Sequence, residues 1–369
     1  MAARVRIAIV ITARPSYAKV RTLIAALVNR HVDVQLIVCA SALLERYGKV
    51  VDVIRKDWPY VPITEVWSTY EGANLLTSAK ETGALLTELS SVLLQLRADA
   101  CVVCADRHEV LAAAQAASYL HLSVVHLQGG ERSGSIDDRV RDAITQLADV
   151  HLVATDCARL RVYSLTGRYD NVYNTGCPSL DVAKQALSEP PVTVKELGGA
   201  GTFLDPQEPF LMVLQHPVTN EMDQARAQMD ATLNAVIRFD LPVLVMWPGQ
   251  DAGMEDVSKQ IRLEQQTGRI HTLRNLPPNR FLRLLTQCSV LIGNSSAGIR
   301  ECSYLGVPIV NVGTRQQGRE RGPNVVDVPH NAGIIAMEIA RQREHGRYPM
   351  STLYGDGTAG EKMADVLCG

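Results

Sequence analysis

Short apolar runs alternate along the whole chain with longer stretches in which apolar residues recur at helical spacing. In the first half, this pattern predicts strands at 6–11, 32–39, 100–104, 123–126, 151–154 and 171–174. Between them it predicts helices at 17–29, 85–96, 109–119, 137–147 and 157–165. The strands lack a clean alternation of apolar and polar positions, which is typical of a parallel sheet with helices on both faces.

The pattern starts again in the second half of the chain. It predicts strands at 210–215, 242–246, 269–273, 290–292 and 307–312, and helices at 222–239, 256–266, 279–286, 297–304 and 333–342. A stretch with proline and glycine at 188–201 separates the halves. We therefore expect two doubly wound, Rossmann-like α/β domains, 1–187 and 188–345, that face a central cleft. A C-terminal helix within about 346–369 is expected to pack back on the first domain.

Composition places the chain among ordinary globular proteins. It has 369 residues, of which 46% are hydrophobic, and a formal net charge of −2, which excludes a broadly basic nucleic-acid-binding protein. No apolar run reaches the roughly 18 residues that a membrane span requires, and the apolar N-terminal run is too short for a secretory signal. We therefore expect a cytoplasmic protein that binds neither nucleic acid nor membrane.

The eight cysteines are scattered along the chain and form no disulfide framework. Cys101 and Cys104 have the CxxC spacing, but they fall within a predicted strand, where residues three apart point to opposite faces. We therefore expect no metal site at this pair.

Ligands of doubly wound domains bind at the carboxyl ends of strands, so the loops that follow strands are the first candidates for chemistry. Arg14 and Lys19 follow the first strand beside a proline near a helix start, a combination that favours anions. Asp106 and Arg107 follow the strand at 100–104, where they offer a possible acid or base and an anion contact. The alternatives are solvated surface charges in the first loop and helix capping by Asp106 in the second.

The densest cluster of polar groups follows the strand at 123–126. Gln128, Glu131 and Asp137 lie there among glycines that allow a ligand to approach the backbone closely. Arg141 is four residues after Asp137 on the predicted helix, so the two can pair. The alternative is an ordinary flexible loop.

Three loops of the second half carry features of an anion site. A histidine follows the strand at 210–215, two serines stand at the start of the helix at 297–304, and arginines lie among glycines after the strand at 307–312. The candidate residues are His216, Asn294, Ser295, Ser296, Glu301, Arg315 and Arg319. The alternatives are a structural histidine, ordinary helix capping and a solvated basic loop. The GxxxxGK[ST] pattern is absent from the sequence, so this is no P-loop nucleoside triphosphatase.

Seven motifs, in order along the chain, are RPSYxK at 14–19, DRxE at 106–109, GGExSGxIDDxxRxAIT at 129–145, GCPSxD at 176–181, HPVTN at 216–220, GNSSxGIxE at 293–301 and GxRQxGRxR at 313–321. Together they resemble the UDP-N-acetylglucosamine 2-epimerase family over about residues 5–345. The segments GGERSGSIDD and GNSSAGIRE resemble its hydrolysing branch.

The resemblance implies a GT-B-like pair of Rossmann domains, no cofactor and no catalytic metal. It implies a UDP-hexosamine substrate, removal of its C2 proton and expulsion of UDP to give a 2-acetamidoglucal, to which water then adds with inversion at C2. We also expect a homodimer or homotetramer. By the same resemblance Asp106 and Asp137 are catalytic acids, and Arg107 and Arg141 are their charge partners. The implied contacts to UDP or the sugar are Arg14, His216, Ser295, Ser296, Glu301, Arg315 and, for the sugar, Asp181.

Two positions depart from the family pattern. Ser16 stands where the first motif usually has aspartate, and Gln128 stands where a third carboxylate precedes the GGE motif. An amide exchanges no proton at neutral pH, so Gln128 is expected to orient substrate, and Glu131 is a candidate to supply the missing carboxylate. The alternatives are an epimerase that retains UDP, action on a modified UDP-hexosamine, a GT-B glycosyltransferase and a silent nucleotide-sugar-binding protein.

Overall fold

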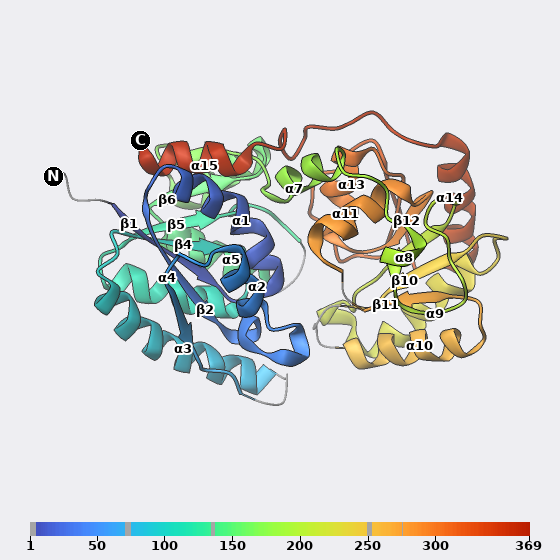
Figure 1. Cartoon of the computed structure of the whole chain (residues 1–369), viewed down its shortest axis with the longest axis horizontal. Helices are drawn as coiled ribbons and strands as arrows, with labels where there is room; N and C mark the ends of the chain where they lie inside the picture. The colour runs from blue at the N-terminus through green and yellow to red at the C-terminus, as the bar shows by residue number, and fades with distance from the viewer. Residues whose placement is uncertain (1–4, 71–74, 134–136, 249–252, 275) are drawn as a thin grey trace. The chain divides into compact units, whose positions relative to one another are not determined.

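The computed structural model describes residues 5–70, 75–133, 137–248, 253–274 and 276–369. The chain forms two compact α/β units (Figure 1). Unit 1 holds the chain up to Glu131, the segment that ends at Asp181, and Gly355–Gly369. Unit 2 holds Val182–Tyr354 and a segment that starts at Arg132. The units divide inside helix α7 (Ser179–Ala186), whereas the sequence predicts a domain boundary at 187.

The sheet of unit 1 has the strand order β3-β2-β1-β4-β5-β6-β7, and its neighbouring strands are parallel. Its strands are β1 Arg6–Ile11, β2 Asp33–Cys39, β3 Ile63–Val66, β4 Ala100–Cys104, β5 Ser123–Leu127, β6 Val150–Val153 and β7 Val172–Asn174. Its helices are α1 Arg14–Asn29, α2 Val50–Asp57, α3 Leu75–Leu96, α4 His108–Tyr119, α5 Asp137–Leu147, α6 Asp156–Thr166 and α15 Ala359–Cys368, with short 3-10 turns at Ala40–Leu43 and Glu45–Tyr47.

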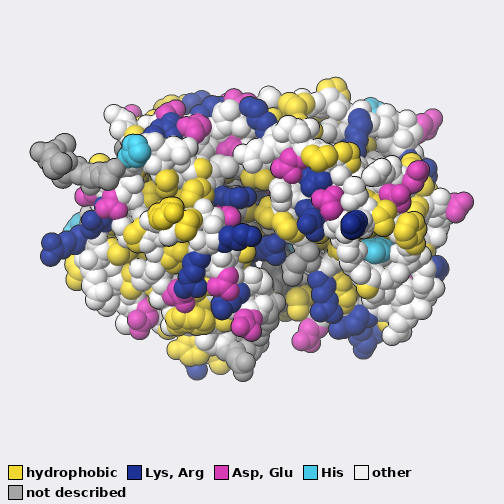
Figure 2. Space-filling model, viewed as in Figure 1, with side chains coloured by type: hydrophobic (Ala, Val, Ile, Leu, Met, Phe, Trp, Pro, Cys, Tyr) yellow, Lys and Arg dark blue, Asp and Glu magenta, His cyan; other side chains and the backbone are white. Residues whose placement is uncertain are grey.

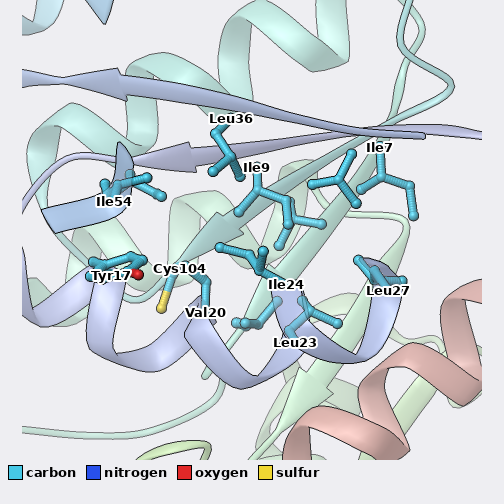
Figure 3. Packing of buried hydrophobic residues seen from close by; sticks show 14 of the residues in the cluster. Ile7, Ile9, Tyr17, Val20, Leu23, Ile24, Leu27, Leu36, Ile54 and Cys104 are labelled. Carbon is cyan, nitrogen blue, oxygen red and sulfur yellow. The ribbon is translucent and has the colours of Figure 1, made fainter. Parts of the chain in front are cut away.

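Helices cover both faces of this sheet, as the apolar strands predict. Along β1, Ile7 and Ile9 point into one buried cluster with α1, α2 and α15, whereas Ala8 and Val10 point into a second cluster with α3, α4 and α5. Figure 3 shows Ile7 and Ile9 facing the apolar side of α1, including Leu23. The central strands are therefore buried on both sides, and only the loops at their ends are available for a site.

The two cysteines of the CxxC motif lie in opposite clusters. Cys104 belongs to the cluster beneath α1, and Cys101 belongs to the cluster beneath α3 and α4. The predicted orientation of the pair in a strand is confirmed, so their sulfur atoms cannot share a ligand.

The sheet of unit 2 has the strand order β14-β13-β12-β9-β10-β11-β8. Its strands are β8 Ala200–Gly201, β9 Leu211–Leu214, β10 Val243–Met246, β11 His271–Leu273, β12 Val290–Gly293, β13 Ile309–Val312 and β14 Val325–Val328. Its helices are α8 Val194–Leu197, α9 Ala225–Val236, α10 Met254–Gln266, α11 Pro278–Gln287, α12 Ser296–Ile299, α13 Glu301–Leu305 and α14 Ala332–His345, with a 3-10 segment at Thr219–Gln224. Apart from β8, which is antiparallel to β11, the strands repeat the Rossmann order seen in unit 1.

The sequence pattern predicted the edge strand β7, but it missed the edge strands β3, β8 and β14. Strands β3 and β14 are edge strands whose residues are mostly half exposed, so they form no apolar run of the kind that marks β1. Helix α3 begins at Leu75, ten residues before the predicted start at 85. The predicted helix at 297–304 is divided into α12 and α13, with Arg300 as a turn residue between them.

The C-terminal helix α15 packs against α1 within unit 1. A Cβ atom at Gly360 would lie 2.6 Å from the backbone of Thr22, so glycine permits the close approach of the two helices. Arg30 adds ion pairs with Glu361 at 2.7 Å and with Asp365 at 2.5 Å. The return of the C-terminus to the first α/β unit therefore rests on both packing and charge.

Asp181 holds the first turn of α15. Its carboxylate oxygens accept hydrogen bonds from the backbone N–H groups of Ala359 and Gly360, each at 2.8 Å. Burial raises the pKa of Asp181, while these two amides act in the opposite direction. This buried carboxylate therefore has a structural role as the cap of α15. The sugar contact that the family resemblance implies for Asp181 stays a prediction.

Asp181→Ala is expected to lower the free energy of unfolding by about 1–2 kcal/mol, because two N–H groups at the start of α15 lose their acceptors. Asp181→Asn, which keeps one acceptor oxygen, should lose less. Urea unfolding and amide hydrogen exchange of α15 measure the effect. Unchanged exchange at Ala359 and Gly360 in the alanine variant would contradict this role.

The surface agrees with the balanced charge of the sequence. Figure 2 shows basic and acidic side chains interspersed over the face in view. Within the described ranges, none of the helices combines the length and the apolar character needed to cross a lipid bilayer.

Candidate functional site

The strand order of each sheet reverses at one switch point, and several candidate residues, including Asp106 and Asn294, follow the strands that border it. In unit 1 this switch point is between β1 and β4, and in unit 2 it is between β9 and β12. Loops that leave such a point turn to opposite faces of the sheet and open a crevice at the carboxyl ends of the strands. The sequence of each loop therefore determines what the crevice can bind.

Arg141 is the centre of a charged cluster in unit 1. It lies on α5, is 2% exposed, and forms ion pairs with Asp106, at the end of β4, and with Asp138 at 2.6 Å. It also donates a hydrogen bond of 2.7 Å to the backbone carbonyl of Glu131. The structure thus joins three predicted residues, Asp106, Glu131 and Arg141. Asp138, which follows the predicted Asp137, is an additional partner.

Electrostatics keeps this arginine charged in spite of its burial. Burial by itself would lower the pKa of Arg141, but the carboxylates of Asp106, Glu131 and Asp138 outweigh it and raise the pKa. A buried cation with several carboxylates close to it is an arrangement that balances charge at a site of proton transfer. The described part of this loop ends at Ser133 and resumes at Asp137, so 134–136 of the GGERSGSIDD segment lie outside the described residues.

Arg107 forms an ion pair with Glu109, two residues further along the chain. Its guanidinium donates to the Glu109 carboxylate at 2.9 Å and 3.1 Å, and Glu109 is 2% exposed. Burial would raise the pKa of Glu109, but the positive charge of Arg107 outweighs it and the pKa is lowered. The side chain of Arg107 remains 40% exposed, so it can still meet an anion.

The loop after β1 is organised by Ser16. The Ser16 hydroxyl accepts from the backbone N–H groups of Thr12 and Ala13, at 3.1 Å and 3.0 Å, and donates to the Ala13 carbonyl at 2.7 Å. These contacts use the full hydrogen-bonding capacity of a hydroxyl. Ser16 therefore shapes the turn at the start of α1, while Arg14 and Lys19 are partly exposed on the same helix.

Gln128 occupies the end of β5 in a strained conformation. It is 2% exposed, has a positive φ of 62°, and donates from Nε2 to the Cys177 sulfur at 3.0 Å. Its Oε1 is buried and has no hydrogen-bond partner among the described residues. A buried acceptor without a donor is costly, and it is a place where a ligand donor can bind.

Asn294 connects several candidate residues of unit 2 by hydrogen bonds. Asn294, after β12, accepts from the backbone N–H of His216 at 2.7 Å and donates to the carbonyl of His216 at 2.8 Å, which ties the ends of β9 and β12 together. Its own carbonyl accepts from Arg315 at 3.3 Å and from Gln316 at 2.9 Å. His216, Asn294 and Arg315 thus form one cluster at the switch point. Gln316 is a member that the sequence did not single out.

The serines and the remaining charged residues lie next to this cluster. Ser295 caps α12 by accepting from the Ala297 N–H at 3.3 Å, and Ser296 is the first residue of that helix. Because α12 has four residues, its dipole is smaller than that of the longer helix we predicted. The buried Oε2 of Glu301 has no partner among the described residues. Arg321, in the arginine-containing loop after β13, pairs with Asp327 at 3.1 Å. Arg319 follows in the same loop and is partly buried.

Glu221, which the sequence did not mark as a candidate, positions the loop that carries Arg315. Glu221, in the 3-10 segment after β9, accepts from Thr314 at 2.6 Å and from Gln228 at 2.6 Å. Thr314 directly precedes Arg315, so Glu221 fixes the start of the loop that carries the arginine. Its position two residues after the HPVT segment was the only sequence signal for it.

We expect the free energy of unfolding of unit 1 to fall at low pH, because two of its buried histidines resist protonation. His126 and His151 are register partners in β5 and β6, and burial lowers the pKa of each to about 4. In the unfolded chain a histidine titrates near 6.5, so below that pH the unfolded state takes up protons that the folded state excludes. The free energy of unfolding should fall by about 3 kcal/mol per histidine as the pH falls from about 6.5 to about 4.

Urea unfolding at a series of pH values tests this expectation. His151→Phe should flatten the acid slope, while substitution of the exposed His31 by glutamine serves as the control and should leave the slope unchanged. An acid slope that is the same in all three proteins would show that these buried histidines are not its origin.

Comparison with known proteins identifies relatives of this chain. A family model described as UDP-N-acetylglucosamine 2-epimerase matches residues 25–368. A UDP-N,N'-diacetylbacillosamine 2-epimerase (hydrolyzing) of Legionella pneumophila is 29% identical over 341 residues, which cover 91% of this chain and 88% of that protein. A UDP-N-acetylglucosamine 2-epimerase of Neisseria meningitidis is 28% identical over 372 residues, which cover 98% of this chain and 94% of that protein.

Solved structures of the same kind share the fold. The Neisseria meningitidis UDP-GlcNAc 2-epimerase bound to UDP-GlcNAc has a TM-score of 0.83 at 16% identity and covers 98% of this chain and 99% of that one. The Methanocaldococcus jannaschii enzyme in complex with UDP-GlcNAc and UDP has a TM-score of 0.80 at 17% identity, with the same coverage. The fold is therefore of the predicted GT-B-like class, with two parallel-sheet α/β units. Since the family model matches most of the sequence, this chain belongs to the UDP-N-acetylglucosamine 2-epimerase family.

Proposed function

We propose that this protein inverts C2 of UDP-N-acetylglucosamine and releases UDP and N-acetylmannosamine. The observation that carries the proposal is the ion pair of Asp106 with the buried Arg141, beside Glu131, at the carboxyl ends of β4 and β5. Proton abstraction from carbon needs a positioned carboxylate, and an adjacent cation balances the charge that the carboxylate gains or loses.

The first step is an anti elimination. Asp106 takes the C2 proton, the electrons of the C2–H bond form a C1=C2 double bond, and the bond from C1 to the diphosphate oxygen breaks. The products are a 2-acetamidoglucal and UDP, which leaves with the electron pair of the broken bond. Asp137 and Glu131 are the candidates for the second acid–base group.

The second step adds water to the glucal. A proton goes to C2 on the face opposite to that of abstraction, and water oxygen binds C1 and loses its proton to the protein. The sum of the two steps converts UDP-N-acetylglucosamine and water into N-acetylmannosamine and UDP. Each step needs one group to accept a proton and one to donate it, so a single carboxylate is insufficient.

We expect unit 2 to bind UDP. Arg315 offers a cation beside Asn294 and His216, and the partly buried Arg319 lies further along the same loop. An arginine neutralises the charge that develops on a leaving diphosphate, which lowers the barrier to its departure. The buried Oε2 of Glu301, which has no hydrogen-bond partner among the described residues, can accept a hydrogen bond from a ribose hydroxyl.

A modified UDP-hexosamine is the second candidate substrate. It is favoured by Gln128, whose buried Oε1 offers an acceptor to a donor on the sugar and exchanges no proton. The relatives in Legionella pneumophila and Campylobacter jejuni carry the name of an N,N'-diacetylbacillosamine 2-epimerase, and the sugar of that name has a second acetamido group. An acetamido N–H is a donor of the required kind.

Product analysis by phosphorus and proton NMR tests the proposal. With UDP-N-acetylglucosamine we expect free UDP and N-acetylmannosamine. UDP-N-acetylmannosamine would instead identify an epimerase that retains UDP. Unchanged substrate, together with turnover of UDP-N,N'-diacetylbacillosamine, would replace the substrate proposed here by the modified one. Transfer of the sugar to an added acceptor would identify a glycosyltransferase, and binding without any turnover a silent binding protein.

A further inference from the structure

His126 is fully buried beside Asp106 and has no part in the chemistry proposed above. Its Nε2 lies 2.9 Å from the carbonyl oxygen of Ala105, and its Nδ1 lies 3.2 Å from the hydroxyl oxygen of Thr145. A carbonyl oxygen can only accept, so Nε2 carries the proton. Nδ1 is then an acceptor, and the Thr145 hydroxyl donates to it. The contacts thus define one tautomer of a neutral ring.

The carbonyl that His126 holds belongs to a strained residue. Ala105 directly precedes Asp106 and has a positive φ of 70°. Residues other than glycine rarely adopt such a φ. The N–H of Ala105 donates to the carbonyl of Leu127 on the neighbouring strand at 3.0 Å. A strained backbone persists only where the surroundings hold it, and here both polar groups of Ala105 are held from the side of β5.

Residues on one face of α5 act on both the side chain of Asp106 and the backbone just before it. Arg141 and Thr145 are four residues apart on the helix, so they project from the same face, and both are buried. Arg141 forms the ion pair with the carboxylate of Asp106, while Thr145 acts through His126 on the carbonyl just before it. The side chain and the preceding backbone of Asp106 are therefore fixed by the same element.

Gly129 provides the space that this arrangement needs. A Cβ atom at this position would lie 2.9 Å from the Nδ1 of His126 and 3.1 Å from the Oγ1 of Thr145. Any larger residue would press between the ring and the hydroxyl. The first glycine of the GGE motif is thus explained by the contact between His126 and Thr145.

We propose that His126 and Thr145 are positioning residues, which hold Ala105 in its left-handed conformation and thereby aim the carboxylate of Asp106 at the reacting proton. The proposal rests on the proposed function, since it assigns Asp106 to proton transfer. Without the contact between His126 and Thr145, Ala105 can relax to a negative φ. This change would rotate the backbone of Asp106 and move its carboxylate.

Two matched pairs of variants test the proposal. His126→Gln keeps an N–H that can reach the Ala105 carbonyl, whereas His126→Leu has none. Thr145→Ser keeps the hydroxyl, whereas Thr145→Val removes it from a side chain of the same shape. A misplacement of about 1 Å at a reacting group costs about 100-fold in rate. We expect a loss of about this size in kcat for the leucine and valine variants, with KM and UDP affinity unchanged, and recovery of most of it in the glutamine and serine variants.

Two results would overturn the proposal. One is a Thr145→Val variant with the kcat of the wild-type protein. The other is a loss that falls equally on kcat, UDP affinity and thermal stability, which would make the pair a purely structural contact. Thermal unfolding of all four variants is measured alongside the kinetics to make this distinction.

A readout without turnover separates this proposal from the proposed function. The carboxyl carbon signal of Asp106 in carbon-13 NMR reports its position next to Arg141. We expect this signal to shift in Thr145→Val and to return in Thr145→Ser, whatever the substrate is. If the wild-type protein leaves UDP-N-acetylglucosamine unchanged but the signal responds in this way, the proposed function fails and the positioning stands. An unaltered signal in Thr145→Val contradicts the positioning itself.

Discussion

Asp106→Asn is expected to abolish exchange of the C2 hydrogen of UDP-N-acetylglucosamine with solvent, while UDP still binds. The amide has nearly the shape of the carboxylate and keeps an oxygen for Arg141, but it cannot take up a proton from carbon. Loss of a general acid or base costs about 100- to 10,000-fold in rate. Deuterium incorporation followed by proton NMR measures the exchange, and calorimetry measures the affinity for UDP.

A matched control for this variant lies on the same unit. Asp142 directly follows Arg141 on α5, but its carboxylate forms an ion pair with Arg161 of α6 at 2.5 Å. Asp142→Asn therefore changes a carboxylate to an amide in a similar pairing without touching the proposed chemistry, and its exchange rate should match the wild-type rate. If Asp106→Asn exchanges the C2 hydrogen as fast as this control, Asp106 is not the base.

Arg141→Leu should cause the largest loss of stability of any single substitution discussed here. It leaves the carboxylates of Asp106 and Asp138 without their shared cation and the carbonyl of Glu131 without its donor. Breaking a buried ion pair on one side costs about 3–5 kcal/mol. Lysine is no substitute, because a single ammonium cannot reproduce the several directed contacts of a guanidinium. We therefore expect Arg141→Lys to be destabilised as well, and to be inactive.

Urea unfolding of unit 1 measures this loss, and Arg161→Leu is the control. Arg161 also pairs with an aspartate, but its side chain is 17% exposed, against 2% for Arg141, so water can solvate the partner that remains. The control should lose about 1 kcal/mol or less. Equal losses in the two variants would show that the cluster around Arg141 has no special energetic role.

The sequence predicted the central strands of both sheets and one edge strand, β7, but it missed the edge strands β3, β8 and β14. Strand β9 is buried throughout, and β1 is buried from Ile7 to Ile11. Continuous burial requires an apolar run that is visible in the sequence. Strand β3 has a single fully buried residue, Val66, so its composition carries little signal. Burial of both faces is thus the property that makes a strand predictable, and edge strands lack it.

The positions of the candidate residues were predictable where these residues directly follow a strand. Asp106 and Asn294 follow β4 and β12, and the parallel topology brings each to a switch point. The role of Asp181 was not predictable, because its partners Ala359 and Gly360 are 178 and 179 residues away and come close only through the fold. The contact between His126 and Thr145 likewise depends on the packing of a helix on a strand.

The most direct test of the account is the fate of the C2 hydrogen when the wild-type protein turns over UDP-N-acetylglucosamine in deuterated water. Elimination through a glucal, with Asp106 as the base, requires that the C2 proton is lost and that the new one comes from solvent. We predict that the N-acetylmannosamine formed carries deuterium at C2 in every molecule. Product that retains the original hydrogen at C2 would contradict proton abstraction by this carboxylate cluster.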